Sequence, residues 1–392
     1  MVAAANHITQ HRFILSGGGT GGHIFPAVAI AKMLQQKYPD AEFLFVGALG
    51  KMEMEKVPKE GFNIVGMPIE GLKRSLSSRN LIVAFKTLQS FWKAKKLLNK
   101  FKPTAVIGTG GYASLPICFM SARAGYPTLL QEQNGFAGLT NRLVAGKAAH
   151  ICCGFPQMDK FFPAGKWSFT GNPVRQNIIA LPLKDTETNR QKAREHFGLN
   201  PNMPVVFITG GSLGARTINE AVFAALVALG EAGVQVIWQM GLPFAKSHGE
   251  AINQRISDHP QVFGGVESPR IYHAPFIYEM DEAYLASDVV ISRAGAISIS
   301  EIAVVGRPAV LVPSPNVTDD HQTTNARVLS DLGAAILVTD KSAPEALITE
   351  TLSLIKDTKK RAEMQEKLKG IAKPQATETI VKIIEECLQK RG

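Results

Sequence analysis

Two segments of this chain share one pattern: a short apolar run, a glycine-rich turn and the start of a helical pattern. The first is RFILSGGGTGGH at residues 12–23, and the second is VVFITGGSLGA at residues 205–215. A strand that leads through a glycine turn into a helix is the unit from which parallel sheets are built. We therefore expect two parallel α/β domains of the doubly wound, Rossmann-like class.

The same alternation of apolar runs and helical patterns continues through both halves of the chain. A helix is expected from about residue 26 to residue 37, and further strands in AEFLFVG, TAVIG, VQVIWQMG, SDVVIS and PAVLVP. A chain of 392 residues is long for a single core. We place the first domain at residues 1–174, joined by a final helix at 375–392, and the second at 175–374, with polar residues 181–200 as the connecting region.

Composition excludes several classes of protein. Hydrophobic residues make up 45% and charged residues 19%, as in a globular enzyme rather than a disordered chain. No stretch reaches the roughly 18 apolar residues of a membrane span, and the apolar run before the first glycine turn is too short for a signal peptide. Four cysteines without CxxC spacing predict buried thiols in a reducing cytosol.

The net charge of +10 is concentrated in one region, because residues 71–131 contain no Asp or Glu. Within this region apolar and basic residues recur at helical spacing, in a segment that ends before a proline: Leu81, Phe85, Leu88, Trp92, Lys86 and Lys93. Two interpretations stay open: docking on an anionic membrane surface, or a core-facing helix with a solvated basic face. Binding to nucleic acid is disfavoured because no recognition motif accompanies the charge.

A nicotinamide dinucleotide site is the first hypothesis for the first glycine turn. Gly17, Gly19 and Gly22 fit the GxGxxG pattern between a strand and a helix. That motif also needs an acid at the end of the following strand to hold the ribose. Asp40 and Glu42 lie at the opposite end of that strand, so the dinucleotide hypothesis loses most of its support.

Three glycine turns remain to be explained, at residues 17–22, 108–111 and 210–214. Tight strand-to-helix turns use glycine for structural reasons, but glycines also let a backbone approach a ligand beside a helix N-terminus. In parallel sheets these turns share the carboxyl edge. Two such domains facing across a cleft would form the site of a nucleotide-sugar glycosyltransferase.

Several polar residues near these turns suggest roles in that chemistry. A helix N-terminus disfavours positive charge, so His23 is expected to be a neutral base; capping of the turn is the alternative. Glu301 could accept hydrogen bonds from ribose hydroxyls, and Gln322 and Asn325 from those of a sugar.

No metal or other cofactor is expected in this site. Asp319 and Asp320 do not form a DxD motif. We expect helix dipoles and Arg175 to stabilise a departing nucleotide diphosphate instead.

Linked motifs over nearly the whole chain resemble one family. They are GGGTGGHIFPAVAIA, IGTGGYASLP, QEQNGFAGLTNRL, GNPVR, GGSLGAR, SRAGAISISE and DDHQTTNA. In this order and spacing the sequence resembles the MurG family, whose members transfer GlcNAc from UDP-GlcNAc to undecaprenyl-pyrophosphoryl-MurNAc-pentapeptide (lipid I), forming lipid II for peptidoglycan. The resemblance implies a GT-B fold, an inverting reaction without a metal, and peripheral attachment to the cytoplasmic face of the plasma membrane.

The resemblance also implies site residues. Its UDP-GlcNAc contacts would be Thr20, Gly21, Gly22, Asn134, Arg175, Ser212, Ile277, Ala296, Ile297, Ser298, Ile299, Ser300, Glu301 and Gln322. In family terms Ile277 offers its backbone to uracil, Glu301 holds the ribose, Ser212 and Arg175 meet the phosphates, and Asn134 and Gln322 address GlcNAc. His23 matches the proposed base. The acceptor side would comprise Gly18, Gly19, Gly110, Gly111, Tyr112 and Glu132.

The sequence departs from the family at His321, where some members carry a second glutamine, and in an N-terminal extension of about ten residues. Other cell-wall enzymes are further possible partners. Two alternatives stay open: a non-hydrolysing UDP-GlcNAc epimerase on the same fold, and a membrane-bound scaffold for other wall enzymes.

Overall fold

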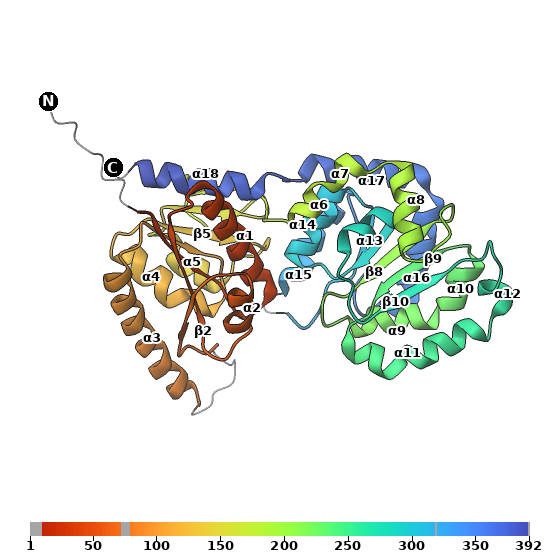
Figure 1. Ribbon diagram of the computed structural model, residues 1–392, viewed down its shortest axis with the longest axis horizontal. Helices are drawn as coiled ribbons and strands as arrows, with labels where there is room; N and C mark the ends of the chain where they lie inside the picture. Colours follow the sequence, from red (N-terminus) through yellow and green to blue (C-terminus); the bar gives the residue numbers. More distant parts are fainter. Residues whose placement is uncertain (1–9, 72–78, 318–319, 391–392) are drawn as a thin grey trace. The chain divides into compact units, whose positions relative to one another are not determined.

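The computed structural model describes residues 10–71, 79–317 and 320–390, and for residues 79–82 it describes the backbone alone. The chain divides into two compact units (Figure 1). Unit 1 contains the described residues up to Val174 and those from Pro374 onward, and unit 2 contains Arg175–Lys373.

Unit 1 is built on a seven-stranded parallel sheet with the order β3-β2-β1-β4-β5-β6-β7. Its strands are β1 (Arg12–Ser16), β2 (Glu42–Ala48), β3 (Ile64–Met67), β4 (Ala105–Gly108), β5 (Thr128–Glu132), β6 (His150–Cys153) and β7 (Trp167–Phe169). Its helices are α1 (Gly21–Lys37), α2 (Glu53–Lys59), α3 (Arg79–Phe101), the short 3-10 helix η1 (Tyr112–Ser114), α4 (Leu115–Arg123), α5 (Leu139–Ala145) and α18 (Ala376–Gln389).

Helices cover both faces of this sheet because alternate side chains of a strand point to opposite faces. Phe13 and Leu15 of β1 pack in a core with α1 and α18, and Ile14 packs in a second core with α3, α4 and α5. Tyr38, which directly follows α1, donates a hydrogen bond to Glu385 Oε1 of α18 at 2.8 Å. The last helix is thereby fixed to α1.

Unit 2 contains a six-stranded parallel sheet with the order β10-β9-β8-β11-β12-β13. Its strands are β8 (Val205–Thr209), β9 (Gln235–Gln239), β10 (Ile271–Ala274), β11 (Val289–Ser292), β12 (Ala309–Leu311) and β13 (Ile336–Leu337). Its helices are α6 (Gln176–Ile179), α7 (Leu181–Lys184), α8 (Glu187–His196), α9 (Arg216–Ala224), α10 (Leu226–Glu231), α11 (Leu242–Ser257), α12 (Pro260–Phe263), α13 (Met280–Ala286), α14 (Ala296–Val305), α15 (His321–Asp331), α16 (Ala343–Lys356) and α17 (Thr358–Ile371).

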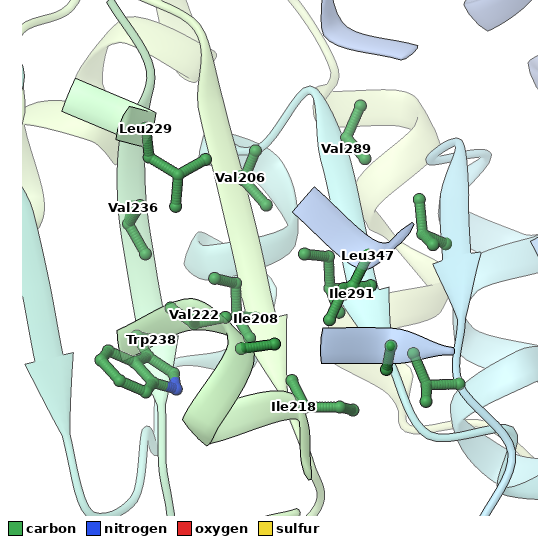
Figure 2. Packing of buried hydrophobic residues seen from close by; sticks show 14 of the residues in the cluster. Val206, Ile208, Ile218, Val222, Leu229, Val236, Trp238, Val289, Ile291 and Leu347 are labelled. Carbon is green, nitrogen blue, oxygen red and sulfur yellow. The ribbon is translucent and has the colours of Figure 1, made fainter. Parts of the chain in front are cut away.

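One core of unit 2 lies between this sheet and helices that include α9, α10 and α16 (Figure 2). Ile208 and Trp238 from neighbouring strands pack there beside Val222 of α9. The indole of Trp238 is fully buried and donates its N–H to Asn219 Oδ1 at 3.0 Å. This bond satisfies the one polar atom of the ring inside an apolar core.

Each sheet reverses its winding direction at one point, where ligands of open α/β sheets usually bind. In unit 1 that point lies between β1 and β4, and in unit 2 between β8 and β11. The turns at residues 17–22 and 109–111 leave the first pair, and those at 210–215 and 293–295 leave the second. The prediction of two parallel α/β domains is confirmed.

Two local predictions were wrong. Helix α1 begins at Gly21, not near Pro26. Glycines disfavour helix on intrinsic propensity, but Ile24 is buried in the core and its amide bonds Thr20 O at 3.2 Å, so packing decides the start.

Residues 181–200 are not a connection between the two units, because they contain α7 and α8 and belong to unit 2. Arg194 is buried and donates to Ala286 O at 3.0 Å, and Arg307 pairs with Asp185 at 2.9 Å. Buried arginines thus attach this polar segment to unit 2, which a polarity pattern does not reveal.

The prediction of buried thiols is confirmed for three of the four cysteines. Cys118, Cys152 and Cys153 are free, buried thiols, and Cys387 is half-buried. Within the part of the chain that the structure describes, no helix is both long and apolar enough to span a bilayer.

Asp185 provides a test of this packing. Burial alone would raise the pKa of its carboxyl, but hydrogen bonds and charge attraction from Arg307 and Arg190 outweigh burial and lower the pKa to about 2. Asp185→Asn should reduce the free energy of unfolding at pH 7 by about 3 kcal/mol, because it leaves Arg307 without its buried partner. Denaturant titration would measure the loss.

The pH dependence has a fixed sign. A lowered carboxyl pKa contributes stability above the unfolded value of about 3.9, and that contribution disappears as the pH falls toward about 2. The difference between the two proteins should therefore stay constant above about pH 5 and shrink below about pH 4. Glu366→Gln, at an exposed pair with Lys369, is the control and should change nothing measurable. An equal loss in both variants would contradict the account.

Candidate active site

The first glycine turn is tightly packed against its own unit. A β-carbon on Gly17 would lie 1.9 Å from Thr109 Oγ1, and one on Gly18 would lie 2.2 Å from Glu53 Oε1. Gly19 has a φ of 85°, a backbone conformation that residues with a side chain rarely adopt. Part of the requirement for glycine is therefore structural.

His23 lies in the first turn of α1 with its ring held by this turn. Its Nδ1 is 3.0 Å from Gly18 O and 3.3 Å from Thr20 Oγ1. A carbonyl oxygen can only accept, so the proton of the neutral ring is on Nδ1 in this contact. Nε2 is then the basic nitrogen, and it faces Gly110, whose added β-carbon would be 3.3 Å away.

The second turn of unit 1 completes the wall around His23. Gly110 and Gly111 both have positive φ, at 93° and 77°. Tyr112 is half-buried, and its ring covers Gly19, whose added β-carbon would be 3.6 Å from Cε1. Burial, and then the charges of Glu53 and Glu70, raise the pKa of Tyr112, so its hydroxyl keeps its proton at neutral pH.

Glu132 is directed at its own loop. The carboxylate is buried at the end of β5. Its Oε1 accepts the amide of Asn134 at 3.0 Å, and Oε2 accepts the amide of Gly138 and Nδ2 of Asn141, each at 2.9 Å. Glu132 therefore fixes the position of Asn134, and its expected contact with an acceptor stays a prediction.

In unit 2, Gln239 joins the turn after β8 to the loop after β10 at the carboxyl edge of the sheet. It is buried at the end of β9. Its Nε2 donates to Thr209 Oγ1 and Gly211 O, each at 3.1 Å, and its Oε1 accepts the amide of Ile277 at 2.9 Å. No motif of the sequence points to Gln239, because a glutamine at a strand end is not part of any glycine motif.

The hydrogen bond to Gln239 reduces the number of backbone groups with which Ile277 could bind a ligand. The backbone amide of Ile277 is used inside unit 2, and its side chain is buried. The carbonyl of Ile277 is its other backbone polar group, and it is an acceptor. Ser212 is exposed in the glycine turn after β8.

Arg175 and Glu301 form an ion pair within unit 2. Arg175 Nε donates to Glu301 Oε1 at 2.9 Å, and Nη2 lies 2.8 Å from the same oxygen. Tyr284, fully buried, donates to Glu301 Oε2 at 3.4 Å. Burial raises the pKa of Glu301, although Arg175 and Tyr284 both act to lower it. The guanidinium is about half exposed, so it can also reach an anion outside.

Other residues that were predicted to contact UDP-GlcNAc lie near the N-termini of α14 and α15. Ala296 and Ile299 are buried, and Ile297, Ser298 and Ser300 are partly exposed. Gln322 is partly exposed, and its Oε1 accepts the amide of Ser314 at 2.9 Å. Asn325 is fully buried and donates to Ala294 O at 3.2 Å, so it supports the β11 turn and is not exposed to a sugar.

The basic amphipathic segment is helix α3, on the lower outer side of unit 1 in Figure 1. The face toward the core includes Val83, Ala94 and Leu98. Three large apolar side chains point to solvent instead: Phe85, Leu88 and Trp92 are 69%, 65% and 66% exposed. We call these three residues the apolar patch. The side chain of Leu81 lies outside the described residues.

The two lysines assigned to this patch have partners in unit 1. Lys86 pairs with Glu70, and Lys93 Nζ donates to Gly66 O at 2.7 Å. Lys96 lies over the Trp92 ring, 5.2 Å from its centroid. Lys96 is therefore a better candidate than Lys86 for contact with an anionic surface.

No group of three or more His, Cys, Asp or Glu side chains suited to a metal occurs in residues 10–71, 79–317 and 320–390. His23 and Tyr112 lie at the switch point of unit 1, and Ser212 lies in the glycine turn at the switch point of unit 2. Glu53 and Gln239, both buried, are the residues that sequence reasoning missed.

Comparisons with known proteins agree with this architecture. Residues 13–153 match the glycosyltransferase family 28 N-terminal domain, and residues 205–380 match the glycosyltransferase family 28 C-terminal domain. A crystal structure of MurG from Acinetobacter baumannii superposes with a TM-score of 0.76 at 30% identity, covering 96% of this chain and 99% of that one.

Two curated relatives are each 46% identical over 371 residues. The proteins from Cytophaga hutchinsonii (95% of this chain and 95% of the relative) and Porphyromonas gingivalis strain W83 (94% and 94%) are both named UDP-N-acetylglucosamine–N-acetylmuramyl-(pentapeptide) pyrophosphoryl-undecaprenol N-acetylglucosamine transferase. The chain therefore has a GT-B fold and belongs to the MurG family of glycosyltransferases.

Proposed function

We propose that this chain transfers GlcNAc from UDP-GlcNAc to the C4 hydroxyl of MurNAc in lipid I, forming lipid II with a β-1,4 linkage. The observation that carries this proposal is the match, over nearly the full length of both chains, to relatives named for that transfer. The placement of a glycine turn at the switch point of each sheet supports it.

The proposed reaction is a single displacement. Nε2 of His23 takes the proton of the C4 hydroxyl, whose oxygen forms a bond to C1 of GlcNAc. The bond from C1 to the diphosphate breaks, and its electron pair leaves with UDP. Attack opposite to the leaving group inverts the α linkage of the donor to β. Thr20, Gly21 and Gly22 lie at the N-terminus of α1, which suits an anionic phosphate.

Glu301 and Arg175 would recognise different parts of UDP-GlcNAc. A carboxylate offers about four acceptor positions, and Arg175 and Tyr284 use three donors on it, so Oε2 retains capacity for a ribose hydroxyl. The half-exposed guanidinium of Arg175 suits the diphosphate. Ser212 would meet the phosphates, the Ile277 carbonyl the uracil, and Asn134 and Gln322 the GlcNAc.

Peripheral attachment to the cytoplasmic face of the plasma membrane follows from the acceptor. The apolar patch on α3, with Lys96 beside it, combines exposed hydrocarbon with positive charge, as interfacial helices do. Contacts with other cell-wall enzymes stay a prediction.

His23→Ala tests the proposed base. Release of UDP that depends on a short-chain lipid I analogue should fall about 10²–10⁴-fold in kcat, since a general base contributes that much, while the KM for UDP-GlcNAc changes little. His196→Ala, at an exposed histidine of α8, is the matched control and should turn over normally. Normal turnover of the His23 variant would remove His23 from the mechanism.

Glu301→Gln tests recognition of the ribose. The KM for UDP-GlcNAc should rise about 10-fold or more, because hydrogen bonds to a charged acceptor are replaced by weaker ones. Since burial raises the pKa of Glu301, lowering the pH should protonate it and raise the wild-type KM, whereas the variant should lose this dependence. Glu345→Gln, at an exposed residue of α16, is the control. An unchanged KM in Glu301→Gln would contradict this role.

The apolar patch makes a prediction about membranes. Trp92→Ser and Phe85→Ser should each weaken binding to vesicles containing anionic lipid about 10-fold or more, because burying a large apolar side chain contributes about 1.5–3 kcal/mol. Added salt should weaken wild-type binding further. Leu183→Ser replaces an equally apolar side chain that is 90% exposed in unit 2, and should bind as the wild type does. Equal binding by all variants would exclude α3 as the contact.

A further inference from the structure

Glu53 is a fully buried carboxylate that the proposed reaction does not use. It is the first residue of α2, just beyond the end of β2. Its Oε1 accepts the amide of Ala48 at 2.9 Å, and its Oε2 accepts the amide of Gly19 at 3.1 Å. A buried carboxylate needs such partners, because removing it from water without hydrogen bonds is costly.

Glu53 occupies space that a side chain at Gly18 or Gly47 would otherwise fill. A β-carbon on Gly18 would lie 2.2 Å from Oε1, and one on Gly47 would lie 2.5 Å from Cγ. The carboxylate occupies the end of the second strand, where dinucleotide-binding folds place an acid for the ribose. In this chain it is buried against the first glycine turn and has no access to a ribose.

One of the two amides that donate to Glu53, that of Gly19, belongs to the peptide group that also contacts His23. The carbonyl of Gly18 and the N–H of Gly19 are the two polar ends of one planar unit. The N–H end donates to Glu53 Oε2, and the carbonyl end lies 3.0 Å from His23 Nδ1. Carboxylate, peptide group and imidazole thus form one hydrogen-bonded series.

We propose that Glu53 is a positioning residue for His23 and acts through the peptide group between Gly18 and Gly19. The negative charge of Glu53 polarises that peptide and makes the Gly18 carbonyl a stronger acceptor, since bonds in series strengthen one another. This keeps the imidazole proton on Nδ1 and leaves Nε2 toward Gly110. It also stabilises the positive ring that forms when Nε2 takes a proton.

Glu53→Gln tests this inference, which rests on the proposed role of His23. The variant keeps the shape of the side chain but removes its charge and one acceptor. We expect kcat to fall about 10- to 100-fold, the equivalent of one lost charge-assisted hydrogen bond, with the KM for UDP-GlcNAc unchanged. Glu55→Gln, at an exposed residue of the same helix, should behave as the wild type. Circular dichroism and thermal unfolding would identify a variant that does not fold.

A double variant separates positioning from a merely structural effect. If Glu53 acts through His23, Glu53→Gln should slow the His23→Ala enzyme no further. Multiplied effects of the two substitutions would overturn the inference, as would a fully active Glu53→Gln enzyme.

A second readout does not depend on activity. In enzyme with ¹⁵N-labelled histidine, the wild-type His23 ring should carry its proton on Nδ1, and Glu53→Gln should move part of the population to Nε2. If Glu53→Gln does not fold, the same measurement is made on Glu53→Asp. It shows whether a shorter carboxylate keeps the wild-type tautomer. An unchanged tautomer in every folded variant would overturn the inference. Normal turnover of His23→Ala would instead count against the proposed base, and the two failures are therefore distinguishable.

Discussion

Parallel pairing of the strands is the constraint on which the candidate functional edge of each unit depends. Because β1 pairs in parallel with both β2 and β4, the turns that follow these strands emerge at one edge of the sheet. The same holds for β8 with β9 and β11 in unit 2. Glycines then allow the turns to pack closely enough to leave helix N-termini and a few polar side chains at that edge. The sheet determines the edge at which these groups lie, and the turns determine their positions along it.

Buried polar side chains hold those turns in position. Glu53, Glu132 and Gln239 each lie at or just after the end of a strand, and each accepts at least one hydrogen bond from a backbone amide of a nearby turn or loop. Glu301 differs, because its partners are the side chains of Arg175 and Tyr284. A carboxylate held by side chains can exchange a partner for a ligand with less rearrangement than one that holds a backbone turn.

The sequence was sufficient for the features that follow from periodicity and glycine spacing. The two-domain α/β architecture, the amphipathic helix α3 and the final helix α18 are all present. It was insufficient wherever the direction of a side chain decides its role. No acidic residue of β2 lies at the end of that strand, but Glu53 of the next helix places a carboxylate there. The polar segment 181–200 packs on the rest of unit 2 through Arg194, which is buried. The bond of Glu53 to Gly19 and the bond of Arg194 to Ala286 join residues 34 and 92 positions apart along the chain, which no local pattern records.

The same limit applies to the candidate site. Linked motifs identified the family, and with it the transfer of GlcNAc, but they could not show that the Ile277 amide is already bonded to Gln239 or that Lys86 pairs with Glu70. Such details change which atoms remain to meet a substrate or a membrane. Motifs fix which residues are present at an edge of the sheet, and packing fixes which of their atoms are available.

The central claim is a single, inverting displacement onto lipid I. It is tested most directly by nuclear magnetic resonance of the product formed by the purified protein from UDP-α-GlcNAc and a short-chain lipid I analogue. The account predicts a GlcNAc joined by a β-1,4 linkage to MurNAc, with one UDP released for each linkage formed. An α-linked product, or an isomer of the UDP-sugar formed without acceptor, would contradict it.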